Sequence, residues 1–259
     1  MKPALSIIKI GGNIIGDGKE LSRLLSFFKQ VSGPKILVHG GGKKASDLSA
    51  KLGVETRMVN GRRVTDKQAL EIAVMVYAGL INKSIVSELQ ALECNAIGLS
   101  GADAGLIKAV KRPVESIDFG FVGDIVSIRT KALHELLQSG LVPVFCALTY
   151  DDGGQLLNTN ADTIASELAI ALSSEYTTTL YYCFEKPGVL ADIENDSSVI
   201  PHINKQTYLS LVREKVIVEG MLPKMENCFH ALDHSVHKVC IGNINMLRPN
   251  PSTFTTLSL

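Results

Sequence analysis

Two lysines stand where a lysine is unexpected, and both could take part in phosphoryl transfer. Lys9 lies within the apolar run "IIKIGG", although removing an unpaired ammonium from water is costly. Lys224 follows Pro223, a residue suited to the first turn of a helix, where the helix dipole disfavours a cation. Lysines in such places could stabilise the oxygens of a moving phosphoryl group. For Lys224, a solvent-facing surface position explains the sequence equally well.

Two glycine clusters could bring a phosphate close to the backbone. Gly11 and Gly12 follow the first expected strand, and the glycines at 40–42 follow the second strand and open a helix. Unobstructed N–H groups at the positive end of a helix suit an anion. Neither cluster fits the P-loop or the dinucleotide-binding pattern. The alternative for the second cluster is a tight turn without a ligand.

A carboxylate lies near the start of another expected helix. Within "QLLNTNADTIASELA" (155–169), Asn160 can cap the helix and Asp162 falls in its first turn. This structural role explains both residues but leaves Asn158 unexplained. A carboxylate held between the two lysines would also keep both of them charged and apart.

The alternation of strand-like and helical stretches predicts an α/β fold. It favours a three-layer αβα sandwich with a mostly parallel central sheet, because the strands are apolar on both faces. The expected strands cover residues 5–10, 35–39, 95–99, 142–148, 178–184 and 238–242. The expected helices cover residues 19–31, 43–52, 66–93, 130–139, 161–173 and 221–234. Both glycine clusters follow strands, where ligands bind in open α/β sheets.

The longest expected helix, 66–93, carries an apolar stripe at steps of three and four residues. The stripe comprises Leu70, Val74, Tyr77, Ile81, Ile85, Leu89 and Leu92. Thr65 and Gln68 predict a capping box at its start, and Asn60-Gly61 predicts the turn of a hairpin over 55–66. The stripe can face the core of the fold or a second copy of the chain.

The composition argues against several classes of protein. Lys plus Arg and Asp plus Glu both number 26, without long blocks of one sign, so we expect no nucleic-acid or membrane-surface binding. The five cysteines form no C-x-x-C pair, and we expect small core residues in a reducing compartment rather than disulfides or a metal site. We see no signal peptide and no apolar run of about 18 residues. These features predict a cytoplasmic enzyme.

Taken together, the motifs resemble those of the amino-acid kinase family, and within it the acetylglutamate kinase branch. The similar blocks, spread over residues 5 to 243, are "IIKIGGNII", "ILVHGGGKKASDL", "VNGRRVTD", "NAIGLSGADAGLI", "GFVGDIVSI", "LLNTNADTIASELA", "KPGVLAD" and "GMLPKMENCFHAL". The resemblance implies that ATP, with Mg²⁺ held mainly by the phosphates, phosphorylates the γ-carboxylate of N-acetyl-L-glutamate in arginine biosynthesis. It also implies an acylglutamate-binding and dimerising lobe (1–174), an ATP-binding lobe (175–259) and a homodimer built on helix 66–93.

The resemblance further implies roles for individual residues in the transfer step. Lys9 and Lys224 would stabilise the transition state, and Asp162 would orient the two lysines. Gly12 and Gly42 would donate N–H groups to the moving phosphoryl group. No side chain is expected to hold a metal.

Substrate and nucleotide contacts are implied in the same way. Gly41, Gly42 and Asn158 would border or bind the substrate, and Arg63 would pair with the α-carboxylate of glutamate, which a bidentate arginine suits. No general base is needed, because the attacking group is already a carboxylate. The implied nucleotide contacts are Gly12, Glu185, Lys186, Gly188 and Lys224.

Two departures from the family pattern affect these expectations. The family usually has a Thr/Ser-Asp pair before "xPGVL", whereas this chain reads Phe184, Glu185 and Lys186, and Glu185 would have to act for the aspartate. Arg62 stands where members often carry an apolar residue. In a paired hairpin Arg62 would face solvent, opposite Arg63, whereas a bulge would turn it to the pocket and suit an N-succinyl substrate.

Two other functions remain open. A sibling enzyme (glutamate 5-kinase, carbamate kinase or aspartate kinase) would use the same fold, although "VNGRRVTD" and "LLNTNADT" favour the acylglutamate branch. A non-catalytic module that senses nucleotide or amino acid would not need Lys9, Asp162 and Lys224, and all three are present. Arginine-inhibited hexameric members of the family carry a helix before the first strand. We see no such extension before the strand expected at 5–10, so we expect the arginine-insensitive dimeric kind.

Overall fold

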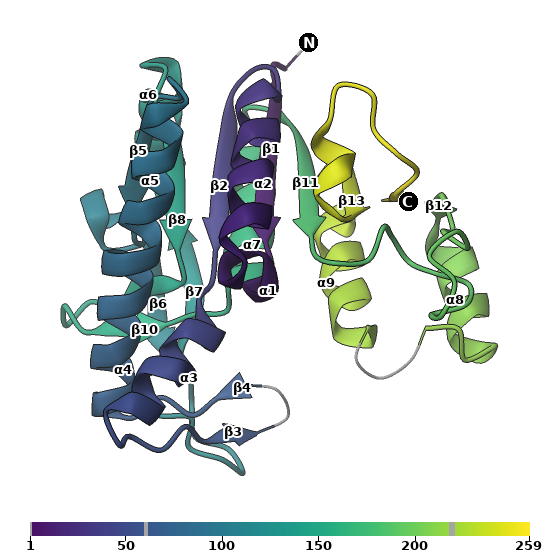
Figure 1. The fold of residues 1–259 in the computed structure, drawn as a ribbon. Helices are drawn as coiled ribbons and strands as arrows, with labels where there is room; N and C mark the ends of the chain where they lie inside the picture. The colour runs from purple at the N-terminus through teal and green to yellow at the C-terminus, as the bar shows by residue number, and fades with distance from the viewer. Residues whose placement is uncertain (1, 60–61, 218–220) are drawn as a thin grey trace.

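The computed structural model describes residues 2–59, 62–217 and 221–259. They form three layers, with an eight-stranded sheet between two layers of helices (Figure 1). Across the sheet the strands are β12 (His202–Ile203), β14 (Thr255–Leu257), β13 (Lys238–Gly242), β11 (Thr177–Cys183), β1 (Ala4–Ile10), β2 (Lys35–His39), β8 (Val142–Cys146) and β5 (Ala96–Leu99). All neighbouring pairs are parallel except β13 and β14. The predicted fold class is confirmed.

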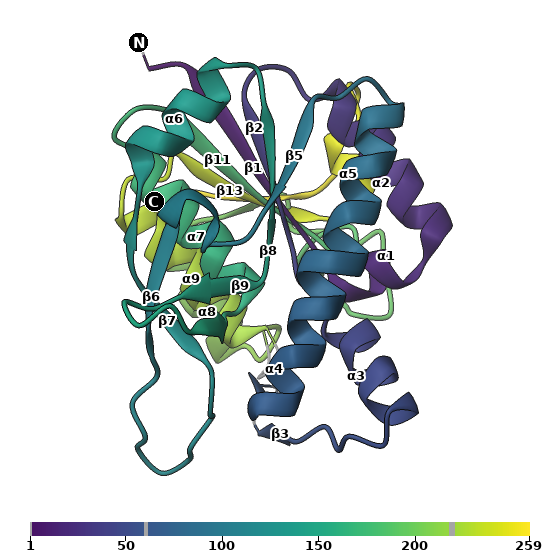
Figure 2. The ribbon, with the colours of Figure 1, turned by 90° about the vertical axis from the view of Figure 1, so that its left-hand side faces the viewer.

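The described helices cover both faces of the sheet. They are α1 (Gly12–Gly16), α2 (Gly18–Gln30), α3 (Gly42–Lys51), α4 (Lys67–Ala73), α5 (Asn82–Ala91), α6 (Thr130–Gln138), α7 (Ala161–Leu172), α8 (Lys205–Arg213) and α9 (Leu222–Asp233). Shorter helical segments are the π-helix η1 (Val74–Ile81) and the 3₁₀ turns η2 (Asp103–Gly105) and η3 (Ile244–Leu247). Figure 2 views the sheet nearly edge-on, with α2 and α5 on one face and α6, α7 and α9 on the other.

The apolar strands explain why the sheet is buried on both faces. In β1 the side chains of Ile7, Ile8 and Ile10 are fully buried, whereas Lys9 is half-buried. Ile10 lies in register with His39 of β2 and with Cys183 of β11. Because the three strands are parallel and end together, the residues that follow them meet at one edge of the sheet.

The long helix predicted over 66–93 is α4, η1 and α5 in succession, and its apolar stripe faces the core as expected. Five members of the stripe are buried, and Val74 and Leu92 pack partly buried against the core. The predicted capping box is wrong. Asp66 caps the helix, accepting from the Ala69 N–H at 2.8 Å. Thr65 is instead buried, and its hydroxyl accepts from the Asn158 side chain at 3.0 Å.

A second, four-stranded sheet was not predicted. Its strands, in spatial order, are β10 (Leu156–Asn158), β9 (Leu148–Tyr150), β6 (Ile107–Lys111) and β7 (Gly123–Ile128). The predicted strand 142–148 therefore divides between two sheets. The polar stretch 191–204 is mostly irregular, as expected, but it ends in β12, and the sequence also left α8 and β14 unpredicted.

The predicted hairpin over 55–66 is present as β3 (Met58–Val59) and β4 (Arg62–Arg63), and its expected turn Asn60-Gly61 lies outside the described residues. The connection between β6 and β7 holds this hairpin, since Thr65 bonds the backbone of Phe119 and Phe121 at 2.9 and 2.7 Å. Gly120 lies between them with a φ of +71°, and a Cβ there would come within 2.2 Å of the Thr65 carbonyl oxygen. Only glycine fits this contact.

Two composition-based expectations can be compared with the fold. All five cysteines are buried with free thiols, which confirms that they are core residues. The helix spanning Lys67–Ala91 is long and apolar enough to cross a membrane by length and composition alone. Half of its most apolar window is buried inside the fold, so we interpret it as a core helix.

His39, the last residue of β2, is fully buried and neutral. Its Nδ1 lies 2.8 Å from the Gly40 carbonyl oxygen, and its Nε2 lies 3.1 Å from Nδ2 of Asn82. Burial lowers the pKa of His39 from 6.5 to about 4; the Gly40 carbonyl opposes this shift and Lys83 adds to it.

This shift makes stability depend on pH. The His39 side chain binds a proton near pH 6.5 in the unfolded chain and only near pH 4 in the folded chain. The stability that the fold gains while His39 is neutral is therefore complete above pH 6.5 and is lost as the pH falls toward 4. Between pH 7 and 4.5, the free energy of unfolding should fall more steeply for the wild type than for His39→Asn, by up to about 3 kcal/mol. Urea unfolding at several pH values measures this difference. Equal pH dependence in the two proteins would show that His39 does not titrate as described.

Candidate active site

An ion pair at the edge of the central sheet forms the centre of the site. Lys9 Nζ lies 2.7 Å from Asp162 Oδ1, and the two side chains are 17% and 20% exposed. Lys9 projects from β1, and Asp162 lies in the first turn of α7, where Asn160 caps the helix as predicted, accepting from the N–H groups of Asp162 and Thr163. The ammonium in the apolar strand is therefore paired, which removes most of the objection to burying it.

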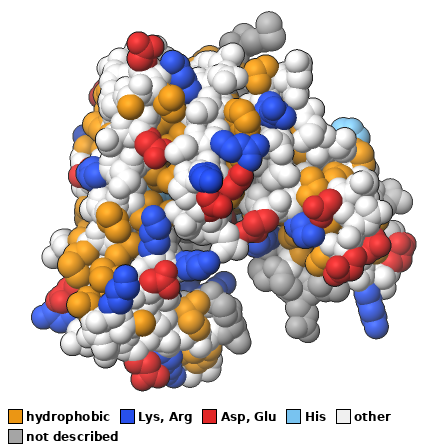
Figure 3. Space-filling view, viewed as in Figure 1, with side chains coloured by type: hydrophobic (Ala, Val, Ile, Leu, Met, Phe, Trp, Pro, Cys, Tyr) orange, Lys and Arg blue, Asp and Glu red, His pale blue; other side chains and the backbone are white. Residues whose placement is uncertain are grey.

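A cavity of about 260 Å³ opens beside this ion pair. It is lined by Lys9, Gly11, Gly12, Asn13, Asp162, Tyr182, Cys183, Phe184, Glu185, Met221, Lys224, Asn227, Cys228 and Ile241. These residues come from the end of β1 and the start of α1, from the first turn of α7, and from the last third of the chain. Figure 3 shows the surface hollowed between the part that carries the β3–β4 hairpin and the part that carries α8.

The structure brings the second lysine to the same cavity. Lys224 lies in the first turn of α9 and is exposed, and its Nζ lies 5.2 Å from the centre of the Phe184 ring. It makes no ion pair with any described residue. Asp162 thus pairs with Lys9 alone, and Lys224 rests against an aromatic face, an arrangement worth about 0.5–1 kcal/mol at an exposed position.

The glycine turn at 40–42 lies close to the same edge. A Cβ on Gly40 would lie 3.8 Å from the Cβ of Ala161, the residue before Asp162. A Cβ on Gly41 would come within 2.5–2.9 Å of Ile81 and Tyr77, so this position has no room for a side chain. The turn is therefore packed between α7 and the long helix.

The residues expected to bind the substrate lie around this turn. The guanidinium of Arg63 donates to the Gly42 carbonyl oxygen at 2.8 Å and to the Ser46 hydroxyl at 2.7 Å. Asn158 reaches the same region through its bond to Thr65, two residues beyond Arg63. Arg62 is exposed, as expected for neighbouring side chains on a paired strand.

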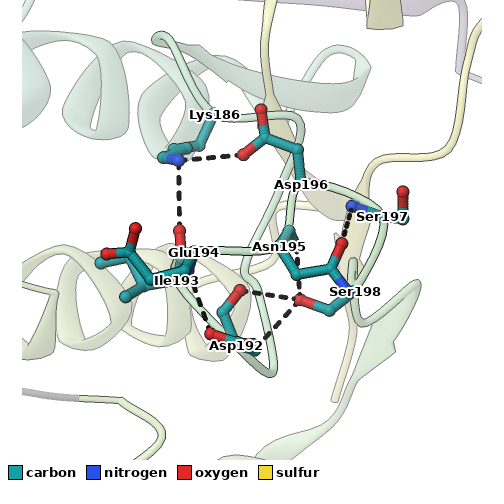
Figure 4. A network of polar contacts seen from close by, with 8 residues as sticks. All are labelled: Lys186, Asp192, Ile193, Glu194, Asn195, Asp196, Ser197 and Ser198. Carbon is teal, nitrogen blue, oxygen red and sulfur yellow. Dashed lines mark hydrogen bonds and ion pairs between the residues drawn. The ribbon is translucent and has the colours of Figure 1, made fainter.

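The residues expected to bind the nucleotide do not all reach the cavity. Gly12, Glu185 and Lys224 line it, whereas Lys186 and Gly188 do not. Lys186 Nζ instead bonds Asp196 at 2.9 Å and the Ile193 carbonyl at 3.2 Å, which ties down the loop over 192–198 (Figure 4).

Gly188 is buried against the last strand. A Cβ at this position would lie 2.7 Å from the Thr255 hydroxyl and 2.8 Å from a Val199 methyl carbon. These contacts give Gly188 a packing function in this structure.

Sequence reasoning missed Tyr182, which lines the cavity beside the ion pair. It lies in register with Lys9 on the neighbouring strand, and its hydroxyl donates to the Asp162 carbonyl at 3.2 Å. Burial raises the pKa of Tyr182 well above its usual value, so the hydroxyl keeps its proton. The alternation of side chains along β11 could have indicated it, once the pairing of β1 with β11 was known.

Comparison with known proteins places the chain in a family. The sequence profile described as "Amino acid kinase family" matches residues 4–243. This chain belongs to the amino acid kinase family. The family resemblance read from the motifs is therefore confirmed.

Individual relatives match over nearly their whole lengths. An acetylglutamate kinase of Bacteroides thetaiotaomicron is 48% identical over 253 residues, which cover 98% of this chain and 98% of the relative. An acetylglutamate kinase of Phocaeicola vulgatus is 51% identical over 241 residues, which cover 93% and 94%. The crystal structure of smu.665 from Streptococcus mutans UA159 superposes with a TM-score of 0.78 at 26% identity, covering 98% of both chains.

Proposed function

We propose that this amino acid kinase phosphorylates the γ-carboxylate of N-acetyl-L-glutamate with ATP, forming an acyl phosphate in arginine biosynthesis. The observation that carries the proposal is the sequence identity of 48% and 51%, over nearly the whole chain, to two proteins named acetylglutamate kinase. The Lys9–Asp162 pair beside two glycine turns supports it, because phosphoryl transfer depends on placed charges and donors more than on covalent chemistry.

In the proposed reaction a carboxylate oxygen of the substrate attacks the γ-phosphorus of ATP, and ADP leaves with the electrons of the broken bond. Lys9 and Lys224 stabilise the oxygens of the moving group, while Asp162 holds Lys9 in place. Gly12 and Gly42 donate backbone N–H groups to the same oxygens. Since the attacking oxygen is already ionised, the reaction needs no base.

Mg²⁺ would neutralise charge on the nucleotide phosphates and be held mainly by them. The carboxylates among the described lining residues are Asp162 and Glu185, and Asp162 is already paired with Lys9. Glu185 takes the place of the aspartate usual in the family. The protein therefore offers the ion few oxygen ligands, which fits a metal that enters with the nucleotide.

On the substrate side, Arg63 pairs with the α-carboxylate of glutamate, and Gly41, Gly42 and Asn158 border the substrate. The guanidinium of Arg63 already lies beside the glycine turn, with its donors directed to Gly42 and Ser46. Arg62 points away and is exposed, which favours an acetyl group over an acyl group with its own carboxylate.

We also propose the larger arrangement that goes with this function. Residues 1–174 bind the acylated glutamate and dimerise, residues 175–259 bind ATP, and the enzyme works in the cytoplasm. Of the proposed nucleotide contacts, Gly12, Glu185 and Lys224 are supported by their place in the cavity. Lys186 bonds Asp196 and Gly188 packs on Thr255, which supports a structural role for these two residues.

The test is ADP release, coupled to a dehydrogenase signal, with N-acetylglutamate, N-succinylglutamate, glutamate, carbamate and aspartate as acceptors. Hydroxylamine added to the same reactions traps an acyl phosphate as a hydroxamate. Highest kcat/KM with N-acetylglutamate, together with hydroxamate formation, supports the proposal. A preference for a non-acylated acceptor would favour a sibling kinase, and ATP binding without turnover would favour a sensing module.

Lys9→Ala and Lys224→Ala should each lower kcat by on the order of 100-fold or more, because each removes charge that stabilises the transition state. Lys51→Ala, an exposed lysine at the end of α3, is the matched control and should keep wild-type turnover. Near-normal kcat in either of the first two variants would contradict the assigned role.

Arg63→Ala should mainly raise the KM for the amino acid, since the proposed contact exists both before and during transfer. Arg62→Ala changes the neighbouring, outward-facing residue of the same hairpin and should leave that KM and the acetyl-to-succinyl ratio of kcat/KM unchanged. An Arg63 variant with a normal KM and a collapsed kcat would assign it to the transfer step instead. A changed acyl ratio in the Arg62 variant would place Arg62 in the pocket.

The chain should form a homodimer through the long helix. Met75 and Leu80 are 53% and 59% exposed, and hydrophobic side chains gather over the lower part of this helix in Figure 3. Light scattering should give a dimer mass for the wild type and a monomer for Met75→Glu/Leu80→Glu. Ile193→Glu, a change of an exposed apolar residue elsewhere, is the control and should remain dimeric. A monomeric or hexameric wild type would refute the assignment.

A further inference from the structure

A buried polar chain runs from the central sheet through the long helix to the glycine turn. Asn82, the first residue of α5, donates its Nδ2 to the Val144 carbonyl at 2.9 Å and lies 3.1 Å from His39 Nε2. His39 Nδ1 in turn lies 2.8 Å from the Gly40 carbonyl oxygen. Asn82 and His39 are 1% and 0% exposed, and the mechanism derived above uses neither.

The hydrogen bonds determine where the imidazole carries its proton. A carbonyl oxygen only accepts, so the atom of Asn82 that faces Val144 must be the amide nitrogen, and the Oδ1 of Asn82 correspondingly accepts from Lys83 at 3.2 Å. The second hydrogen of that nitrogen points to His39 Nε2, which must therefore accept. The proton lies on Nδ1, from which it is donated to Gly40.

Fixing the Gly40 carbonyl also fixes the next N–H group. The chain has no cis peptide bond among the described residues, and in a planar trans peptide the C=O and N–H point in opposite directions. With the Gly40 oxygen held toward His39, the Gly41 N–H must point away from it. Within the described part of the chain this N–H has no hydrogen-bond acceptor.

Two features of the fold make room for this chain of contacts. The π-helix η1 ends at Ile81, directly before Asn82, and both Ile81 and Tyr77 of this segment pack on Gly41. Such wide turns occur frequently at functional sites. Gly98 of β5 leaves the space that Asn82 occupies, since a Cβ there would lie 2.0 Å from the Asn82 oxygen.

We propose that His39, held in one tautomer by Asn82, is a positioning residue that fixes the Gly40–Gly41 peptide and so orients the Gly41 N–H for phosphoryl transfer. The inference rests on the proposed kinase reaction. It assigns the buried histidine and asparagine to the reaction through the backbone donor of that turn.

A pair of substitutions separates the two hydrogen bonds of the imidazole. In His39→Asn the amide nitrogen occupies the place of Nδ1 and can still donate to Gly40, but the contact with Asn82 is lost. In His39→Gln the longer side chain can reach Asn82 but not Gly40. Because positioned donors are worth about 100-fold or more in kcat, we expect His39→Gln to lose at least about tenfold and His39→Asn to stay within about threefold, each with little change in KM.

Two controls separate positioning from loss of stability. Thermal unfolding is measured for both variants, and assays are run where each is folded. Tyr176→Phe removes a remote, buried hydrogen bond to His134 and shows how activity responds to destabilisation alone. If the two His39 variants lose kcat equally, in proportion to their stability, the proposal is overturned; if both keep wild-type kcat, it is overturned as well.

A second readout does not depend on kinase activity. The ¹H–¹⁵N signal of the Gly41 amide should shift strongly in His39→Gln and stay near its wild-type position in His39→Asn. An unmoved Gly41 signal in His39→Gln would overturn the positioning role even in a fully active enzyme. An inactive wild type with the expected Gly41 shifts would instead reject the proposed reaction and leave the positioning of the turn supported.

Discussion

The ion pair between Lys9 and Asp162 is the contact on which the rest of the site depends. A lysine in a strand that is flanked on both sides by other strands can be accommodated only if its ammonium finds a charge partner near the sheet edge. The parallel order of β11, β1 and β2 provides that edge, and the Asn160 cap starts α7 where Asp162 can reach across it. The sheet topology and the helix cap therefore together determine the electrostatics of the site.

Around this pair, backbone groups as well as side chains shape the site. Among the glycines that follow β1 and β2, Gly41 has no room for a Cβ against Ile81 and Tyr77, and a Cβ on Gly11 would lie 3.2 Å from the Cys183 carbonyl oxygen. The N-termini of α7 and α9 both face the same edge, and their dipoles suit an anion there. A kinase that must hold a highly charged group with little covalent chemistry can use such fixed donors without reorganising them.

The sequence predicted six neighbouring strands of the central sheet, from β13 to β5, but missed β12 and β14 at one edge and most of the supporting contacts. Buried parallel strands read as continuous apolar runs, so β2 and β13 were predicted with their observed bounds. The strands β9 and β10 have three residues each and carry no such pattern. Asp66 rather than Thr65 caps the helix, because the Thr65 hydroxyl accepts a hydrogen bond from Asn158, a residue 93 positions away in the sequence.

The candidate site divides along the same line. Lys9 and Lys224 could be singled out because each occupies a position that disfavours a cation, and Asp162 because the first turn of a helix favours a carboxylate. The structure brings all three to one cavity. The resting place of Lys224 on Phe184, the burial of Tyr182 and the contact of His39 with Asn82 could not be predicted. Each depends on residues that are distant in sequence and brought together only by packing.

The most direct test of the account is a double-mutant cycle on kcat with Lys9→Met, Asp162→Asn and the combined variant. If Asp162 acts by holding Lys9, the two changes act as a unit, and the double variant should lose hardly more than Lys9→Met alone. If the two losses multiply, Asp162 and Lys9 work independently, and the ion pair is not the centre of the site.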